Sequence, residues 1–182
     1  LLDLSKMESG KIPLAIEPVN LTGLLPEVFE NLKGLMNGKQ IEIRWKIQDG
    51  LAPIESDPLK IRQVLLNLLS NAIKFTEVGS ITISASNVNG GIQFSIEDTG
   101  LGMKQEDLPF IFDPFRQIDG SMTRRVGGSG LGLTIVKNVL NLLHGKIDVQ
   151  SEFGRGSTFT VFLPERIGRP SESSGLTKEL HK

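Results

Sequence analysis

The chain contains no cysteine, no tyrosine, two histidines and a single tryptophan. Without cysteine there can be no disulfide, no thiolate nucleophile and no cysteine-ligated zinc site. One tryptophan and no tyrosine do not form the aromatic platform on which single-stranded nucleic acids stack. The 20 basic and 21 acidic residues leave a formal net charge of −1, so the chain also lacks the excess positive charge that holds a polyanion. We therefore expect no nucleic-acid partner.

Long apolar segments are absent as well. No run approaches the roughly 18–20 apolar residues that cross a bilayer, and the first residues do not follow the basic-then-apolar order of a signal peptide. We therefore expect no direct membrane contact. Because the chain does not begin with methionine, we expect it to be a piece of a longer protein, whose other parts can include a membrane anchor.

Apolar spacing and capping residues predict three helices. The first spans 20–37, with Asn20 as its N-cap, and Pro26 predicts a kink or a later start. The second spans 57–75, where Asp57 is the N-cap and Pro58 occupies the first helical position. The third runs from about 131 to 143 and stops at Gly145.

Alternating residues between these helices predict extended segments, with residues 104–118 forming short helical turns at most. The predicted segments span 14–19, 41–47, 80–87, 92–97, 147–151 and 157–163. The pairs 80–87 with 92–97 and 147–151 with 157–163 predict hairpins. Helices grouped beside hairpins predict an α+β fold with an antiparallel or mixed sheet covered on one face.

The predicted 57–75 helix carries a polar stripe. Asn67, Asn71 and Lys74 recur at helical spacing, opposite an apolar face formed by Ile61, Leu65, Leu68, Leu69 and Ala72. Taken alone, such a stripe is most often a solvated face. Asparagine is a poor helix former, however, and two amide oxygens beside an ammonium can hold a hard cation and a phosphate.

Glycine is in excess, at 20 residues against about 13 at average usage, and it concentrates in two segments. In the first, Asp98 precedes Gly100 and Gly102 at a predicted strand end, where a tight turn lets a flat ligand approach and the carboxylate can accept a bond from an amine. The second segment, 127–133, opens the third helix, whose free N–H groups favour an anion. Its spacing is neither a Walker loop nor a dinucleotide fingerprint.

A further segment holds Phe112 and Phe115, which taken alone predict a local apolar core. Between them and the glycines lie three arginines, at 116, 124 and 125. Arginines on a glycine-hinged loop can close over a triphosphate.

The order of these segments resembles the ATP-binding catalytic domain of sensor histidine kinases. The motifs are Asn-x-x-x-Asn, Asp-Thr-Gly-x-Gly, Phe-x-Pro-Phe and Gly-Gly-x-Gly-Leu-Gly-Leu, within residues 57–133. The segment 112–125 is most similar to the lid of hybrid-type sensor kinases. The fold implied is the Bergerat two-layer α/β sandwich of DNA gyrase, HSP90 and MutL, with a mixed, mostly antiparallel sheet covered on one face by about three helices.

The resemblance implies roles for individual residues. Asn71 is expected to ligate Mg²⁺, with Asn67 beside it. Lys74 and Arg124 are expected to act on the phosphates as the catalytic basic groups, and Asp98 to accept a bond from the adenine amine, supported by Ser157. The remaining expected ATP contacts are Gly100, Gly102, Phe112, Phe115, Gly128, Gly130, Leu131 and Gly132.

The same resemblance implies partners and boundaries. Residues 1–11 resemble the end of a dimerisation helix, 12–165 the catalytic domain, and 166–182 a linker or disordered tail. Expected partners are ATP, a histidine-containing dimerisation domain of the same homodimeric protein, and a response-regulator receiver domain. No phosphoacceptor motif is present, and His144 is interpreted as a helix-end residue. The aromatic-Arg pair that many relatives carry after the Phe motif is Arg116-Gln117 here, which leaves the γ-phosphate contact open.

Three other functions stay open. One is a serine kinase of the anti-sigma type, against which the resemblance of residues 1–11 to a dimerisation helix argues. A nucleotide-sensing module would keep every motif without transferring phosphate. An ATP hydrolase of the gyrase or HSP90 kind would need a glutamate four residues before Asn71, and Asn67 stands there instead.

Overall fold

The computed structural model describes residues 13–116 and 130–167. Along the chain these form β1 (Glu17–Val19), α2 (Leu21–Glu30), the 3₁₀ turn η1 (Lys33–Met36), β2 (Gln40–Ile47), β3 (Ile54–Ser56), α3 (Pro58–Phe75), β4 (Val78–Val88), β5 (Gly91–Asp98), η2 (Leu108–Phe110), α4 (Gly132–Leu142), β6 (Lys146–Glu152) and β7 (Gly156–Pro164).

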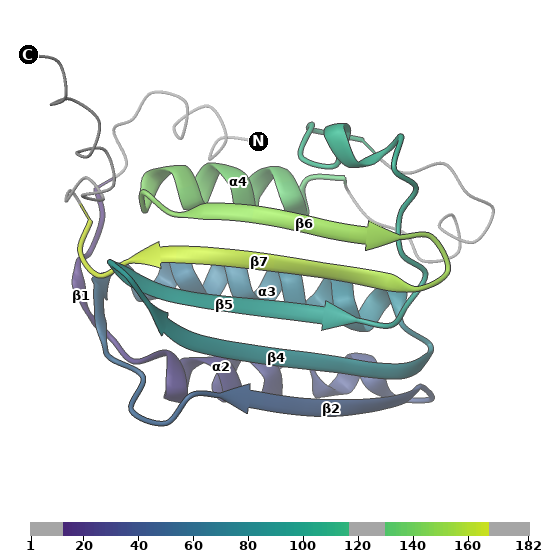
Figure 1. Cartoon of the computed structure of the whole chain (residues 1–182), viewed down its shortest axis with the longest axis horizontal. Helices are drawn as coiled ribbons and strands as arrows, with labels where there is room; N and C mark the ends of the chain where they lie inside the picture. The colour runs from purple at the N-terminus through teal and green to yellow at the C-terminus, as the bar shows by residue number, and fades with distance from the viewer. Residues whose placement is uncertain (1–12, 117–129, 168–182) are drawn as a thin grey trace, which may run out of the picture.

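Five strands form the main sheet, in the order β2-β4-β5-β7-β6. The β2–β4 pair is parallel and the other pairs are antiparallel. Helices α2, α3 and α4 lie behind one face of this sheet, so the described chain has two layers (Figure 1). The mixed α+β sandwich expected from the sequence is therefore confirmed.

The core lies between α3 and the sheet. Alternate residues of β5, namely Ile92, Phe94 and Ile96, are buried toward the helices, while Gln93 and Glu97 are exposed on the open face. The apolar face of α3 meets them, with every one of the five predicted apolar residues buried. Asp98 continues the buried row of β5, which places a carboxyl group at the edge of the core.

The first helix is shorter than predicted. Asn20 caps it through a 2.9 Å bond from the Thr22 N–H, and it runs through Pro26, but it ends at Glu30 rather than near residue 37. The 3₁₀ turn η1 follows, because Gly34 weakens the helix and Leu35, 52% exposed, has no surface to pack on.

A second correction concerns the end of α4. The residue that leaves the helix in a left-handed conformation is His144, with φ 54°, rather than Gly145. The Gly145 N–H bonds the Leu140 carbonyl at 2.8 Å, which closes the last turn. A Cβ at Gly145 would lie 2.7 Å from the Phe162 carbonyl oxygen, so this glycine is needed for packing. His144 does lie at the helix end, as interpreted from the sequence.

A small sheet joins both ends of the described chain. β1 pairs with β3 in antiparallel register, although the sequence did not predict β3. Arg166 bridges to Glu55 in β3, with an ion pair at 3.3 Å, and Ile167 packs against the core. Residues 1–11 and 168–182 lie outside the described residues. No described helix is both long and apolar enough to span a membrane.

Candidate functional site

Helix α3 is fixed at its N-terminus by Asp57. One carboxylate oxygen accepts the N–H groups of Leu59 and Lys60 at 3.0 and 3.1 Å, and the other accepts the Ala15 N–H at 3.0 Å. This cap satisfies orphan donors of the first turn and also ties the segment before β1 to the helix. The predicted start of this helix is confirmed.

Asn67, in the polar stripe of α3, lies against the start of α4 rather than in open solvent. Asn67, Asn71 and Lys74 are all half-buried. The Asn67 side-chain N–H donates to the Gln63 carbonyl at 2.8 Å. Its Oδ1 faces the first residue of α4, because a Cβ built at Gly132 would lie 3.0 Å from that oxygen. The structure therefore brings Asn67 and the last glycine motif together.

Lys74 stands at the far end of the stripe. Its ammonium lies 5.2 Å from the centre of the Phe75 ring. Burial lowers the pKa of this ammonium, because a charged group is less stable away from water. An anionic ligand beside this ammonium would offset the free-energy cost of removing its charge from water.

Lys39 holds the C-terminal end of the same helix. Its Nζ donates to the carbonyls of Ile73, Lys74 and Thr76 at 2.7, 3.2 and 3.1 Å, and pairs with Glu77 at 2.9 Å. These carbonyls are the unsatisfied acceptors of a helix end. Sequence reasoning missed Lys39, because its partners lie more than 30 residues away and no local pattern marks it.

Asp98 ends β5, directly opposite Ser157 of β7. It is 7% exposed, and its Oδ1 accepts the Gly100 N–H at 2.9 Å. Burial raises the pKa of the Asp98 carboxyl to about 6, against the lowering effect of hydrogen bonds from the Gly100 and Ser157 backbones, while the Glu97 charge raises it further. A buried carboxyl with a raised pKa at a strand end is typical of a functional site.

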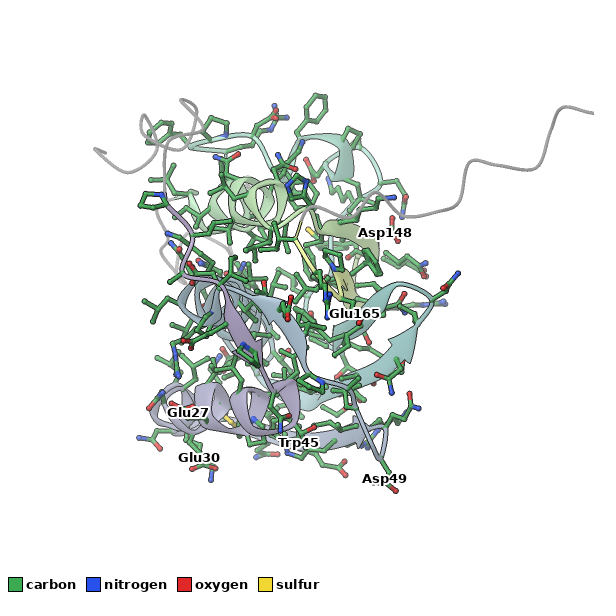
Figure 2. The ribbon with its side chains drawn as sticks, turned by 90° about the vertical axis from the view of Figure 1, so that its left-hand side faces the viewer. Glu27, Glu30, Trp45, Asp49, Asp148 and Glu165 are labelled. Atoms are coloured by element: carbon green, nitrogen blue, oxygen red, sulfur yellow. The ribbon has the colours of Figure 1, made fainter. Side chains whose placement is uncertain are left out.

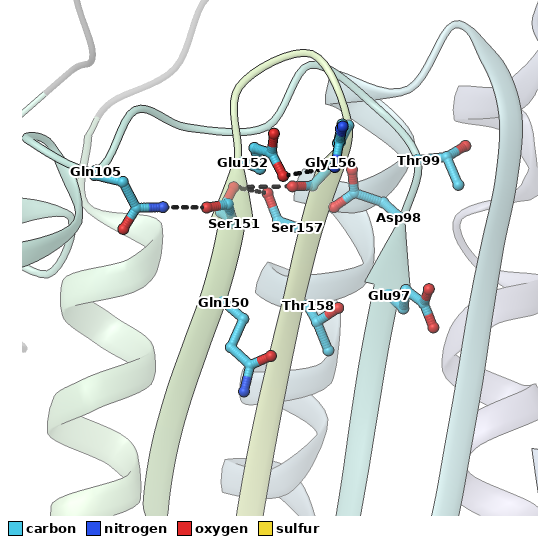
Figure 3. Close-up of a pocket in the computed structure, with 11 residues that line it drawn as sticks. Glu97, Asp98, Thr99, Gln105, Gln150, Ser151, Glu152, Gly156, Ser157 and Thr158 are labelled. Carbon is cyan, nitrogen blue, oxygen red and sulfur yellow. Dashed lines mark hydrogen bonds and ion pairs between the residues drawn. The ribbon is translucent and has the colours of Figure 1, made fainter.

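A serine network supports this strand end (Figure 3). The Ser151 and Ser157 hydroxyls lie 2.9 Å apart, and Ser151 Oγ also donates to the Gly156 carbonyl at 2.9 Å. The Met103 N–H donates to Ser151 Oγ at 2.8 Å, which ties the segment after Gly102 to β6. Ser151 was not predicted, since an isolated serine within a strand carries no sequence signal.

The glycines near Asp98 allow segments of the chain to approach one another. A Cβ at Gly100 would overlap the Phe75 carbonyl, and one at Gly102, where φ is 62°, would overlap the Glu152 carbonyl. The Leu101 N–H bonds Phe75 O at 3.1 Å, which joins this turn to the end of α3. These contacts give both glycines a packing role, whatever else they contact.

The two predicted aromatics differ in environment. Phe112 packs against the core, and its carbonyl accepts a 3.0 Å bond from Thr134 of α4. Phe115 is 65% exposed, with φ 62°. The prediction of local core is therefore right for Phe112 and wrong for Phe115, which lies in a turn and is exposed.

The predicted phosphate loop is described only at its margins. Arg124 and Gly128 lie outside the described residues. Gly130 has φ 69°, and a Cβ there would lie 2.9 Å from the Arg116 carbonyl oxygen, so Gly130 packs directly beside Arg116. Leu131 then caps α4, whose first residue is Gly132.

A shallow cavity of about 600 Å³ opens beside Asp98 and Ser157, at the ends of β5, β6 and β7. None of its lining residues belongs to α3 or α4, so it does not include the asparagine stripe. Within residues 13–116 and 130–167, no three His, Cys, Asp or Glu side chains gather in a metal-binding group. Amide oxygens, such as those of Asn67 and Asn71, are also suitable ligands for a hard cation that keeps several waters.

Comparisons with known proteins find related chains. The chain is 36% identical over 183 residues to hybrid signal transduction histidine kinase L of Dictyostelium discoideum, covering 97% of this chain and 11% of that protein. It is 37% identical over 191 residues to the autoinducer 2 sensor kinase/phosphatase LuxQ of Vibrio harveyi, covering 98% and 22%. The chain thus spans less than a quarter of the length of either relative.

Among solved structures, full-length ShkA in complex with AMPPNP matches with a TM-score of 0.79 and 35% identity, over 90% of this chain and 34% of that chain. Residues 56–167 match the family described as histidine kinase-, DNA gyrase B-, and HSP90-like ATPase. This match contains α3, the Asp98 turn and α4. The chain therefore belongs to the histidine kinase-, DNA gyrase B- and HSP90-like ATPase family, and its relatives in these comparisons are sensor histidine kinases.

Proposed function

We propose that this chain binds Mg·ATP and donates the γ-phosphate to a histidine on a dimerisation domain outside residues 1–182. The observation that carries the proposal is the buried Asp98 carboxyl at the end of β5. It lies beside the turn that contacts the end of α3. A relative with the same fold and 35% identity was solved with the ATP analogue AMPPNP, which supports a nucleotide as the ligand.

In this proposal, different residues bind the adenine and the phosphates of ATP. Asp98 is an acceptor for the exocyclic amine of adenine, and Ser157, opposite it in the sheet, can act through water. At the other end, Asn67 of α3 faces Gly132 at the N-terminus of α4, and Asn71 and Lys74 follow Asn67 along the same helix. The free N–H groups of a helix N-terminus favour phosphate.

The asparagine stripe fits a magnesium ion. Asn71 would ligate it through its amide oxygen, with Asn67 adjacent, and phosphates and water would complete the shell. Bound Mg²⁺ would neutralise part of the phosphate charge. The residues of this chain would then hold the triphosphate in place, since phosphoryl transfer depends mainly on position and charge. Arg124 and Gly128 belong to this proposal as phosphate contacts.

Hydrolysis of ATP is a weaker candidate. The position four residues before Asn71 is Asn67, whose amide N–H is engaged by the Gln63 carbonyl. An amide cannot accept a proton from water as a glutamate does. We therefore infer that a phosphoacceptor histidine, rather than water, receives the phosphate.

The proposal implies further partners. Residues 1–11 would end a dimerisation helix of a homodimeric protein, and 166–182 would form a linker. A receiver domain of a response regulator would accept the phosphate from histidine. ATP and response regulators are found in the cytoplasm. The proposed function therefore implies a cytoplasmic domain.

Calorimetric titration of ATP into the 182-residue chain, with and without Mg²⁺, tests the binding step. The informative variant is Asp98→Asn, and the matched control is Glu97→Gln. Glu97 is the neighbouring carboxylate, but it is exposed on the other face of β5. We expect binding to be lost in Asp98→Asn and retained in Glu97→Gln. Phosphate transfer is then measured by adding a separate histidine-containing dimerisation domain and radiolabelled ATP.

Each negative result of the titration or the transfer assay would contradict a different part of the proposal. Binding that survives Asp98→Asn would contradict the placement of adenine. Binding without transfer to any supplied histidine domain would favour the nucleotide-sensing alternative. Absence of binding by the unmodified chain, with the fold intact by circular dichroism, would overturn the proposed function.

A further inference from the structure

Strand β2 lies at one margin of the main sheet and pairs only with β4 among the described residues (Figure 1). The Gln40 and Gln48 N–H groups donate toward β4, each at 2.9 Å, to Glu77 and Ala85. Successive peptide groups of a strand point in opposite directions. The residues between these glutamines whose backbone groups point away from the sheet are therefore Ile41, Ile43, Trp45 and Ile47.

The sequence of this edge is nearly palindromic. From Gln40 to Gln48 it reads Gln-Ile-Glu-Ile-Arg-Trp-Lys-Ile-Gln, centred on Arg44. If two copies pair in antiparallel register about Arg44, Ile41 faces Ile47 and Ile43 faces Trp45 of the second copy. All four are residues whose backbone groups point outward. The register that matches the side chains therefore also aligns the backbone donors and acceptors.

The charges of the edge fit the same register. Glu42 faces Lys46 of the second copy, and symmetry repeats this opposite-charge pair. Arg44 faces its own copy, but its guanidinium already bonds Glu42 of its own strand at 2.5 Å. Charged residues on an edge strand usually prevent pairing. Here the charges of Glu42 and Lys46 favour pairing with another copy, and only Arg44 meets a like charge.

Apolar surface accompanies the edge on the helix side. A groove of about 690 Å³ lies between α2 and β2, and its apolar lining includes Phe29, Met36, Ile43 and Trp45. Trp45 is 39% exposed, and its ring lies edge-to-face against Phe29, with the centroids 5.6 Å apart. Figure 2 shows Trp45 at the same end of the molecule as Glu27 and Glu30 of α2. Ile43 of a second copy would cover the exposed side of Trp45.

We propose that the β2 edge is an interface between two copies of this chain. The two β2 strands pair in antiparallel register about Arg44 and join the two five-stranded sheets into one. The interface is isologous, because the same residues contribute from both copies. It rests on β2 and α2 and does not depend on nucleotide binding.

Sedimentation velocity of the 182-residue chain over increasing concentration measures the association. Trp45 is the single tryptophan, so its fluorescence reports this interface directly. We expect a concentration-dependent dimer and a shift of the emission to shorter wavelength in the same concentration range. The shift follows from removal of water from the indole ring.

A charge swap makes the test specific. Glu42→Lys and Lys46→Glu each replace two opposite-charge pairs by two like-charge pairs, so each should weaken dimerisation roughly tenfold or more. The double variant E42K/K46E restores opposite charges and should return the affinity to within about threefold of the original. Arg44→Gln removes the one like-charge contact and should strengthen the dimer. Glu106→Lys is the control, because Glu106 is exposed and pairs with Lys104 rather than with β2.

Circular dichroism serves as the control for folding. We expect each variant to fold, because all the changed side chains are exposed. The proposal is overturned if the chain stays monomeric up to about 1 mM. It is also overturned if the double variant is no better than the single ones. A dimer that none of the charge variants affects, with unchanged Trp45 emission, would place the contact elsewhere, such as in residues 1–11.

Discussion

Gly132, the first residue of α4, faces the side-chain amide of Asn67 in α3 so closely that a Cβ would lie 3.0 Å from Asn67 Oδ1. This contact joins two motifs that are 65 residues apart, and it leaves no free room for a methyl group. Asn67 and the start of α4 are therefore packed directly on one another. A substitution at either residue should therefore shift the position of the other.

We predict that Gly132→Ala weakens Mg·ATP binding several-fold while the free energy of unfolding stays equal or rises. Alanine favours helix over glycine by up to about 1 kcal/mol, but its methyl group must displace the Asn67 amide by a few tenths of an ångström. Titration calorimetry and urea unfolding measure the two effects. Gly23→Ala in α2 is the control, since a Cβ there meets nothing within 4 Å. Equal effects of both variants on binding would contradict the prediction.

The Asp98 carboxyl predicts opposite pH dependences for stability and binding. Its pKa is about 6 in the folded chain, against 3.8 for an unperturbed aspartate. Asp98 therefore stays protonated to a higher pH in the folded state than in the unfolded state. As the pH rises from 3.8 to about 6, the free energy of unfolding falls by roughly 3 kcal/mol in all. Above about pH 6 this contribution no longer changes. Adenine needs the ionised carboxylate as acceptor, so ATP affinity should fall about tenfold for each pH unit below 6.

Asp98→Asn isolates this contribution. Urea unfolding of both proteins at about pH 5 and about pH 8 should show the variant gaining stability relative to the unmodified chain at the higher pH. The same titrations of ATP should show a flat affinity above about pH 7 for the unmodified chain. An Asp98→Asn variant with the same pH profile of stability as the unmodified chain would show that another group titrates.

The elements with local signals were the ones that could be predicted. Helix α3 has a capping aspartate, a proline at its first position and a regular apolar face, so its start at Pro58 and its approximate end near Phe75 were predicted. Strand β3 has only three residues, Ile54–Ser56, and exists because β1 and Arg166 pair with it. No periodicity can develop over such a length, which explains why it was missed.

The candidate site shows the same division. Asp98, Asn67 and Asn71 stand in motifs of unusual composition, and the sequence identified them. Lys39 and Ser151 act through partners that are close only in the folded chain. The excess of glycine was interpreted as room for a ligand. At Gly100 and Gly102 the structure shows backbone carbonyls where a Cβ would lie, because the turns around Asp98 pack directly on α3 and β6. These two glycines therefore also have a packing role that the sequence did not indicate.

Gly156 and Gly154 give a matched pair for testing this packing. Both have positive φ, at 113° and 83°, but a Cβ at Gly156 would overlap the Asp98 carbonyl, whereas one at Gly154 meets nothing within 4 Å. We predict that Gly154→Ala costs about 1–2 kcal/mol of unfolding free energy from backbone strain alone. Gly156→Ala should cost several kcal/mol more, because the β5 and β7 ends must separate. Urea unfolding of both variants measures the difference, and equal costs would contradict the packing role.

The last prediction concerns Lys39, whose ammonium bonds three carbonyls at the end of α3. We expect Lys39→Met to lower the free energy of unfolding by about 2–3 kcal/mol, because hydrogen bonds to a charged donor are strong and the carbonyls lose their partner. Lys33→Met is the control: Lys33 makes an exposed pair with Glu30, and its loss should cost at most about 0.5 kcal/mol. The change should also loosen the turn that packs on this helix end, where the Leu101 N–H bonds Phe75 O. Amide hydrogen exchange at Leu101 should therefore accelerate more than at the centre of β5. Uniform acceleration across the domain would mean that Lys39 stabilises the fold as a whole without positioning the Asp98 turn.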